Sequence, residues 1–261
     1  MNVLIVTDLE GISGVNSIDD IFEKESEGYR RGRERLMADT NTAVRAAFDA
    51  GAQKVYVCDG HGGGKNFIEG ALDQRAVQIS VSRNPETIHD SDVVVAIGMH
   101  AMAGTQRAFL DHTQSSKNIH HYFYNGKRIG ELTQIGVYTG HFGVPCVAVS
   151  GDLAACNEAK ALFGENVAVA VVKETDVRNS AICVDYDTAE ARIYQAVKEG
   201  IANKHLVSPI IQALPFEIAV EYNSTARCDE VCKARADVER VDGYTVRSVK
   251  TKIENFRDVL L

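Results

Sequence analysis

Short apolar segments that run into charged or polar residues recur along this chain, and they constrain its fold more than any other feature. The clearest of these segments lie at residues 3–6, 55–57, 93–97 and 144–149. Apolar runs of this length, without alternating polar residues, are typical of parallel strands that are buried on both faces. Because polar turns and helical patterns separate them, the order of elements predicts a three-layer α/β fold with a largely parallel sheet.

The helical patterns between these strands have recognisable ends. The longest is expected at about residues 26–50, where Gly51 follows as a C-terminal cap. Shorter helices are expected at about residues 130–140 and 152–163. Each of these helices would return the chain to the start of the next parallel strand, as the predicted fold requires.

The pattern changes after about residue 170. Residues 188–204 have helical periodicity, and residues 216–222 alternate apolar with polar side chains, as a half-buried antiparallel strand does. We therefore expect a metal-binding catalytic α/β domain over residues 1–170 and a smaller C-terminal α+β lobe over residues 171–261. A chain of 261 residues is long enough for one large domain with such an appendage.

The composition restricts the partners of this protein. The formal net charge is −8, whereas binding to nucleic-acid phosphates needs a basic surface. No stretch approaches the roughly 18 consecutive apolar residues of a membrane span. We therefore expect neither a nucleic acid nor a membrane as partner. The N-terminal segment lacks the basic residues and the long apolar run of an export signal, which predicts a cytoplasmic protein.

Candidate metal ligands follow three of the expected strands. Asp8, His61 and His100 each lie just past a strand end, and the carboxyl ends of parallel strands converge on one crevice. Glu10, two residues after Asp8, can project to the same side. Carboxylate oxygens of this kind suit a divalent metal ion. The alternative is a solvated turn closed by the glycines that follow.

The glycines around His61 permit several interpretations. Three consecutive glycines, Gly62–Gly64, leave the backbone free to approach a ligand closely. The His-Gly-Gly-Gly string also matches a lipase oxyanion motif, but the chain has no G-x-S-x-G nucleophile elbow. Phosphate-binding and dinucleotide-binding glycine patterns are absent as well, so no nucleotide cofactor is expected. Metal ligation by His61, with Asp59 as its orienting partner, is the better explanation.

Two further candidates are weaker on the residues alone. His112 lies in a glycine-containing loop, where it could transfer a proton or stabilise a transition state, or be an ordinary surface residue. Glu131 falls in the first turn of an expected helix, where an acid usually interacts with the helix dipole. The adjacent His120 and His121 would face opposite sides of a strand, so no catalytic role is expected for them.

Taken in order, these motifs resemble the D-aminopeptidase family of dinuclear zinc aminopeptidases. The matching segments are Asp8-Leu9-Glu10-Gly11-Ile12-Ser13-Gly14, Asp59-Gly60-His61, His100-Ala101-Met102-Ala103, Asp111-His112 and Gly130-Glu131-Leu132. Any one of them is a weak signal, but five in the same order are specific. The resemblance covers most of the chain and weakens after about residue 185.

The resemblance implies a metal centre and a reaction. It implies two zinc ions per subunit and the metal ligands Asp8, Glu10, His61, His100 and Glu131. It also implies that Asp8 bridges the ions and that His112 is catalytic. The expected reaction releases N-terminal residues, D-amino acids in this family, from short peptides or amino-acid amides by a metal-activated water. Family members form ring-like homo-oligomers. Residues that echo the family further on, and are expected to line the substrate site or an interface, are Lys173, Arg178 and Asn179.

Two other functions stay open at this point. A metal-dependent phosphohydrolase is compatible with acids after the first strand, although Glu10 and Ile12 replace the later positions of an Asp-x-Asp-x-Thr motif. A non-catalytic metal- or peptide-binding protein would bind zinc without hydrolysing aminoacyl substrates. The sequence also leaves open the stereochemistry, the preferred side chain, the native metal and the general base.

Overall fold

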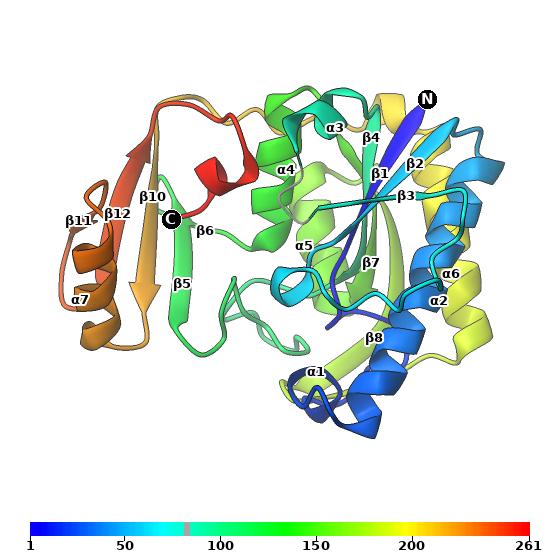
Figure 1. Ribbon diagram of the computed structural model, residues 1–261, viewed down its shortest axis with the longest axis horizontal. Coiled ribbons are helices and arrows are strands. Elements are labelled where there is room, and N and C mark those ends of the chain that lie inside the picture. The colour runs from blue at the N-terminus through cyan, green and yellow to red at the C-terminus, as the bar shows by residue number, and fades with distance from the viewer. Residues whose placement is uncertain (81–83) are drawn as a thin grey trace.

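The structure is a computed structural model that describes residues 1–80 and 84–261, without the side chain of Phe22. Its described strands form two sheets, which Figure 1 shows as two lobes with helix α4 (Glu131–His141) between them. The strand order is β3-β2-β1-β4-β7-β8-β9 in the larger sheet and β11-β12-β10-β5-β6 in the smaller one. Among the described helices, none combines the length and the apolar character that a membrane span requires.

The larger sheet confirms the predicted parallel arrangement. Its strands are β1 (Asn2–Thr7), β2 (Lys54–Asp59), β3 (Val77–Ile79), β4 (Val93–Met99), β7 (Cys146–Asp152), β8 (Ala168–Val177) and β9 (Ser180–Cys183). Neighbouring strands are parallel except for the β8–β9 hairpin. Every residue of β4 and β7 is buried, because helices cover both faces of the sheet.

Helices on the two faces complete the three predicted layers. One face packs against α2 (Glu27–Asp49) and α6 (Tyr186–Ala202), and the other against α4 and α5 (Leu153–Phe163). Local sequence sets the helix ends. The hydroxyl of Ser26 accepts a hydrogen bond from the Tyr29 amide at the start of α2, and the carboxylate of Asp152 accepts one from the Ala155 amide at the start of α5. Two shorter helices are α1 (Asp19–Phe22) and α3 (Pro85–His89).

The smaller sheet is antiparallel and combines segments that are distant in sequence. Its strands are β5 (Ile119–Tyr124), β6 (Lys127–Arg128), β10 (Phe216–Tyr222), β11 (Glu239–Arg240) and β12 (Thr245–Lys250). Helix α7 (Thr225–Ala234) packs on it, and the 3-10 segments are η1 (His61–Gly63), η2 (Lys204–Leu206) and η3 (Phe256–Val259). The lobes thus differ from the predicted division at residue 170. Strand β8 continues the parallel sheet beside β7, while β5 and β6 pair with the later strands.

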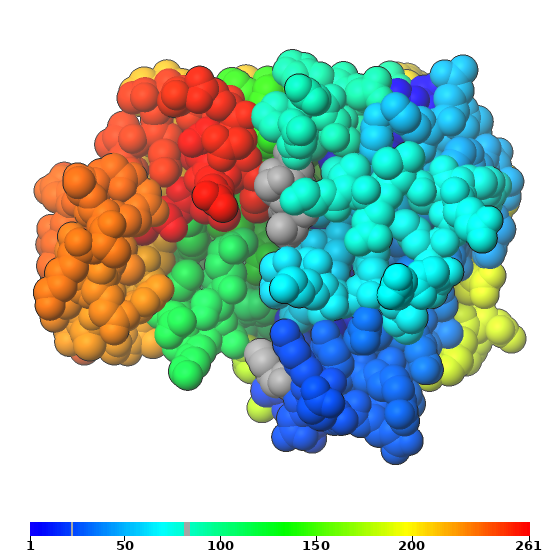
Figure 2. Space-filling view, in the orientation of Figure 1, coloured from blue at the N-terminus to red at the C-terminus, as the bar shows by residue number. Residues whose placement is uncertain are grey.

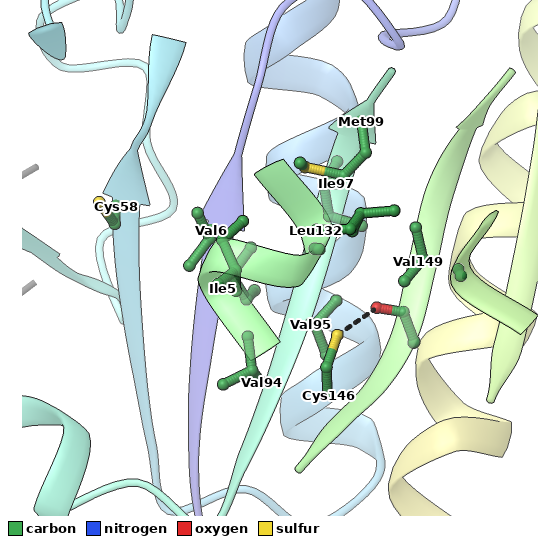
Figure 3. Close-up of a cluster of buried hydrophobic side chains, with 14 of the residues drawn as sticks. Ile5, Val6, Cys58, Val94, Val95, Ile97, Met99, Leu132, Cys146 and Val149 are labelled. Atoms are coloured by element: carbon green, nitrogen blue, oxygen red, sulfur yellow. Dashed lines mark hydrogen bonds between the residues drawn. The ribbon is translucent and has the colours of Figure 1, made fainter. Parts of the chain in front are cut away.

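The core lies between the larger sheet and α4. Figure 3 shows Ile5 and Val6 of β1 with Ile97 of β4 and Leu132 of α4 in one apolar cluster. Leu132 is fully buried, and burying a leucine side chain contributes about 1.5–3 kcal/mol. Since Leu132 follows Glu131 directly, this packing fixes the first turn of α4, and with it the carboxylate of Glu131, against the carboxyl ends of the strands.

Candidate active site

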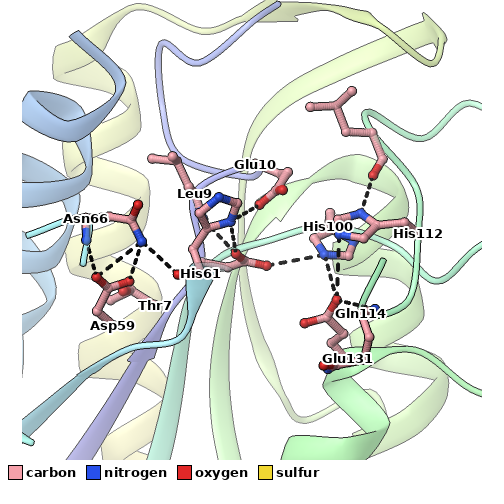
Figure 4. Close-up of polar contacts among 12 residues, drawn as sticks. Thr7, Leu9, Glu10, Asp59, His61, Asn66, His100, His112, Gln114 and Glu131 are labelled. Atoms are coloured by element: carbon pink, nitrogen blue, oxygen red, sulfur yellow. Dashed lines mark hydrogen bonds and ion pairs between the residues drawn. The ribbon is translucent and has the colours of Figure 1, made fainter. Parts of the chain in front are cut away.

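The five predicted metal ligands converge at the carboxyl ends of β1, β2 and β4 (Figure 4). His61 Nδ1 lies 3.0 Å from Asp8 Oδ1 and 3.0 Å from Glu10 Oε2. His100 Nε2 lies 3.3 Å from Asp8 Oδ2 and 3.3 Å from Glu131 Oε1. The two oxygens of Asp8 therefore face different histidines, and its carboxylate lies between the two halves of the cluster.

The donor atoms of this cluster fit a divalent metal ion. His100 Nδ1 lies 3.0 Å from the Ala101 carbonyl oxygen. A proton on Nδ1 that is donated to this oxygen leaves Nε2 with a lone pair that faces carboxylates. Among the described residues, His100 Nε2 and Glu10 Oε2 are buried polar atoms without a hydrogen bond of good geometry. Imidazole nitrogens and carboxylate oxygens are the usual ligands of zinc, and a cation would satisfy both atoms.

Contacts within the cluster keep two of its carboxylates ionised. Burial opposes charge on Asp8, but the adjacent imidazoles of His100 and His61 outweigh it and hold the pKa of that carboxyl well below its usual range. Burial likewise opposes charge on Glu131, and its contact with His100 nevertheless lowers its pKa. These carboxylates therefore stay negative at neutral pH, which favours cation binding.

His112 lies beside the metal cluster. Its ring stacks on that of His100, with ring centroids 3.9 Å apart and ring planes inclined by 10°. Its Nδ1 lies 2.8 Å from the Leu110 carbonyl oxygen, and its Nε2 lies 3.8 Å from Glu131 Oε1. Since Nδ1 can donate to that carbonyl, Nε2 is the nitrogen available to a reacting group. The position of His112 favours the catalytic interpretation over that of an ordinary surface residue.

Two residues with left-handed backbone conformations flank His112. Leu110 has φ +51° and Gln114 has φ +65°, values that are unfavourable for residues other than glycine. The carbonyl of Leu110 faces His112, and the amide of Gln114 donates a 2.9 Å hydrogen bond to Glu131 Oε1. Backbone strain of this kind persists where surrounding contacts require it, often at active sites. Nothing in the residue types of Leu110 and Gln114 indicated these conformations.

A cavity of about 640 Å³ opens over the cluster. Its lining includes Asp8, Glu10, His61, His112 and Glu131. Four of the five predicted ligands and His112 therefore line one cavity, which is large enough for a small substrate. A buried anionic cluster with a histidine at the edge of a cavity is an arrangement suited to metal-assisted hydrolysis.

Comparison with known proteins agrees with this chemistry. The family model described as D-aminopeptidase (Peptidase_M55) matches residues 1–261. The chain belongs to the D-aminopeptidase family. A D-aminopeptidase of Bacillus subtilis (strain 168) is 30% identical over 216 residues, which cover 80% of this chain and 77% of that relative. The predicted resemblance and the predicted aminopeptidase class are therefore confirmed.

A solved structure shares the fold of this D-aminopeptidase family member. It is described as "Zn-dependent D-aminopeptidase DppA from Bacillus subtilis, a self-compartmentalizing protease". It matches with a TM-score of 0.90 and 24% sequence identity, and the match covers 99% of this chain and 95% of that one. The predicted α/β architecture is confirmed by this agreement over nearly the whole chain.

Lys173 supports the active-site loop that follows β1 in this aminopeptidase. The sequence had suggested instead that Lys173 lines the substrate site or an interface. It is fully buried, and its Nζ donates a 2.7 Å hydrogen bond to the Glu10 carbonyl oxygen and another to that of Val15. Burial lowers the pKa of Lys173 to about 8. Lys173 therefore holds the loop that carries Glu10.

Arg178 holds the loop that carries the predicted catalytic histidine. Its Nε lies 3.1 Å from Asp111 Oδ1, and its guanidinium also donates to the Asp111 carbonyl oxygen. The neighbouring Asn179 carbonyl accepts a hydrogen bond from the Ile18 amide. The turn of the β8–β9 hairpin thus contacts both the segment after β1 and the loop that carries His112.

Asp59 acts on His61 indirectly. The sequence suggested a direct orienting contact, but both Asp59 oxygens accept hydrogen bonds from Asn66. The amide side chain of Asn66 also donates to the His61 carbonyl oxygen, at 2.8 Å, and its Oδ1 accepts from the Tyr29 hydroxyl. Asn66 is therefore the residue that fixes the backbone of His61 (Figure 4). No sequence motif identified it.

The expectation that His120 and His121 face opposite sides of β5 is wrong. The register between β5 and β10 shifts between Glu221 and Tyr222, so that His120 falls in a bulge. The two imidazoles meet edge to face at 4.0 Å, and His121 Nδ1 lies 3.0 Å from Glu221 Oε2. These three residues could hold a cation, but the charge of Arg128 opposes a positive charge there.

Proposed function

We propose that this protein is a zinc-dependent aminopeptidase that releases N-terminal D-residues from short peptides or amino-acid amides. One observation carries the proposal. Two imidazoles and three carboxylates form a buried cluster under a cavity, and Asp8 contacts both histidines in it. Membership of the D-aminopeptidase family supports the reaction, and the zinc dependence named for the structurally similar DppA supports the choice of metal.

We propose that two zinc ions bind on the two sides of Asp8. Glu10 and His61 would complete one side, and His100 and Glu131 the other. Bound there, zinc supplies a water of lowered pKa and polarises a carbonyl group. The potential ligand atoms of His100, His112 and Glu131 also lie within 4.8 Å of one another. Zinc content therefore has to be measured to separate a ligand role of His112 from a catalytic one.

The protein's own groups orient the substrate and move a proton. The Leu110 carbonyl holds His112 Nδ1–H, so that Nε2 faces the cavity next to Glu131. When Nε2 carries a proton, it can donate to the scissile carbonyl oxygen as negative charge develops there. The stacked ring of His100 keeps the imidazole of His112 in this orientation. The proposed role of His112 is therefore stabilisation of the oxyanion.

We also propose that the protein forms a homo-oligomer, with a ring as the family expectation. DppA is described as self-compartmentalizing, which supports assembly of similar chains. The β8–β9 hairpin at the sheet edge exposes Val177 to 61% and Ile182 to 82% of their surface. Exposed apolar side chains at a sheet edge favour burial against another chain.

The proposed function is tested by removal and return of the metal. The purified protein is treated with a chelator, and hydrolysis of D-alanyl-D-alanine is measured before and after zinc is added. We expect activity to be lost with the metal and restored by zinc. A phosphomonoester assayed in parallel should not be hydrolysed. Zinc-dependent phosphomonoester hydrolysis, or zinc binding without hydrolysis of any aminoacyl substrate, would contradict the proposal.

A further inference from the structure

The cavity over the metal cluster carries positive side chains as well as carboxylates. Lys24, Lys117 and Arg257 line it together with the proposed metal ligands. We name these three residues the cationic rim. They belong to separate segments of the chain, namely the turn between α1 and α2, the loop before β5, and η3. Three distant segments thus bring positive charge to the space in which the substrate would bind.

The charges of the cationic rim are available to a ligand. Within residues 1–80 and 84–261, the side-chain nitrogens of these three residues make no ion pair or hydrogen bond. Other arginines, of intermediate exposure, do, since Arg227 pairs with Glu230 and Arg235 with Asp237. An anionic group of a substrate in the cavity would therefore meet cations that no nearby acid has neutralised.

The backbone of Arg257 is fixed relative to the metal cluster. Asn255 and Asp258 form a capping box at the start of η3, and Val259 is fully buried. The ring of Phe256 packs edge to face on Tyr138 of α4, with centroids 5.5 Å apart. Because α4 begins at Glu131, η3 and the metal cluster share one rigid support. Figure 2 shows this C-terminal segment, in red, directly above the green part of the smaller lobe.

The size of the cavity matches a short peptide. A sphere of its volume would be about 11 Å across, which is roughly the span of three extended residues. The walls also carry apolar side chains, among them Ile135, Phe256 and Leu260. A peptide of two or three residues with its N-terminal peptide bond at the metal cluster would therefore keep its C-terminal carboxylate inside the same cavity, whose lining includes the rim.

We propose that the cationic rim binds the C-terminal carboxylate of the substrate and makes this enzyme selective for free di- and tripeptides over the corresponding amides. This inference rests on the proposed aminopeptidase function, because that function fixes which end of the peptide lies at the metal. Arg257 can bind a carboxylate with two parallel N–H donors, and Lys117 and Lys24 contribute point charges. The rim determines substrate class and takes no part in bond cleavage.

Two substrates with the same scissile bond test the proposal. D-alanyl-D-alanine and D-alanyl-D-alaninamide differ only in the C-terminal group, so the ratio of their kcat/KM values measures recognition of the carboxylate. For the zinc-loaded wild-type protein, we expect a ratio of about ten or more in favour of the free peptide. Arg257→Ala and Lys117→Ala should each move this ratio toward one, mainly through a higher KM for the free peptide.

Two further variants separate charge recognition from structural damage. Arg257→Lys keeps the charge and should retain part of the preference. Arg227→Ala removes a half-buried arginine of α7 that does not line the cavity and should leave the ratio unchanged. Equal kcat/KM values for the two substrates, or a ratio that Arg257→Ala and Lys117→Ala leave unchanged, would overturn the inference while the proposed function stands. Failure to hydrolyse either substrate would instead contradict the proposed function and the inference with it.

Discussion

The imidazole of His112 lies flat on that of His100, with ring centroids 3.9 Å apart. This contact joins a proposed catalytic residue to a proposed metal ligand, although eleven intervening residues form a loop between them. Two backbone contacts complete the arrangement, since Leu110 holds the His112 ring and Gln114 holds Glu131. The loop therefore places Nε2 of His112 at the edge of the metal cluster.

Replacement of His112 separates catalysis from metal binding. His112→Ala should retain the zinc content of the wild type and lose ~10²–10³-fold in kcat, as is typical when an oxyanion donor is removed. Zinc is measured by elemental analysis, and kcat with D-alanyl-D-alanine. His120→Ala, which removes an exposed histidine from the bulge in β5, serves as control. Near-normal kcat would exclude the proposed role, and a loss of zinc would identify His112 as a ligand.

The left-handed conformation of Gln114 has a measurable effect on stability. Gln114→Val places a β-branched residue at φ +65° and should destabilise the protein by about 1–2 kcal/mol and lower kcat. Gln114→Gly, which favours this conformation and keeps the amide that donates to Glu131, should retain activity. Urea unfolding and kcat are compared for both variants. If the valine variant were as stable and active as the glycine variant, the strained loop would have no role.

Lys173 should support both the fold and the metal site. Lys173→Met leaves the carbonyl oxygen of Glu10 without its donor and that of Val15 with only the weak thiol donor of Cys183. At about 1–3 kcal/mol for an unsatisfied buried group, the variant should be less stable by at least this amount and should bind zinc more weakly. Lys198→Met, a change in α6 at a side chain remote from these carbonyls, is the matched control. If Lys173→Met had an unchanged free energy of unfolding and an unchanged zinc affinity, Lys173 would have no such supporting role.

Glu158 should make the stability of the zinc-free protein depend on pH. Burial raises the pKa of Glu158 to about 7, whereas in the unfolded chain it stays near the ordinary glutamate value of 4.5. Between these values the folded state holds a proton that the unfolded state has released, so stability falls as pH rises from about 4.5 to 7. The Glu158→Gln variant has no carboxyl group to ionise at this position, so its stability should not fall in this way as the pH rises. Its unfolding free energy minus that of the wild type should grow by about 1–3 kcal/mol between pH 5 and 8, and a pH-independent difference would refute the assignment.

The strand ends were predictable because the sequence pattern that marks a buried strand lies within the strand itself. Uninterrupted apolar runs placed β1, β2 and β4 correctly, and the residues after them, Asp8 and His61 among others, converge as parallel strands require. The helix of Glu131 was also predictable. Its proposed role as a ligand was not, because an acid in a first helical turn has an ordinary explanation and only the resemblance selected it.

Features that depend on tertiary contacts could not be predicted. Asn66 fixes His61 through a hydrogen-bond network between separate segments, and such networks have no local pattern. The bulge that brings the side chains of His120 and His121 together arises from pairing with β10, about a hundred residues later in the chain. The pattern after residue 170 resembled a new lobe, and no local signal indicated that β8 pairs with β7 and extends the first sheet.

We propose that Asp8 lies between two zinc ions. Anomalous diffraction from crystals of the zinc-loaded protein, recorded on both sides of the zinc absorption edge, tests this arrangement directly. We expect two zinc peaks, one near His61 and Glu10 and the other near His100 and Glu131, with the Asp8 carboxylate between them, and their loss in Asp8→Ala. A lone peak that Asp8 does not contact, or zinc bound only at His120, His121 and Glu221, would contradict it.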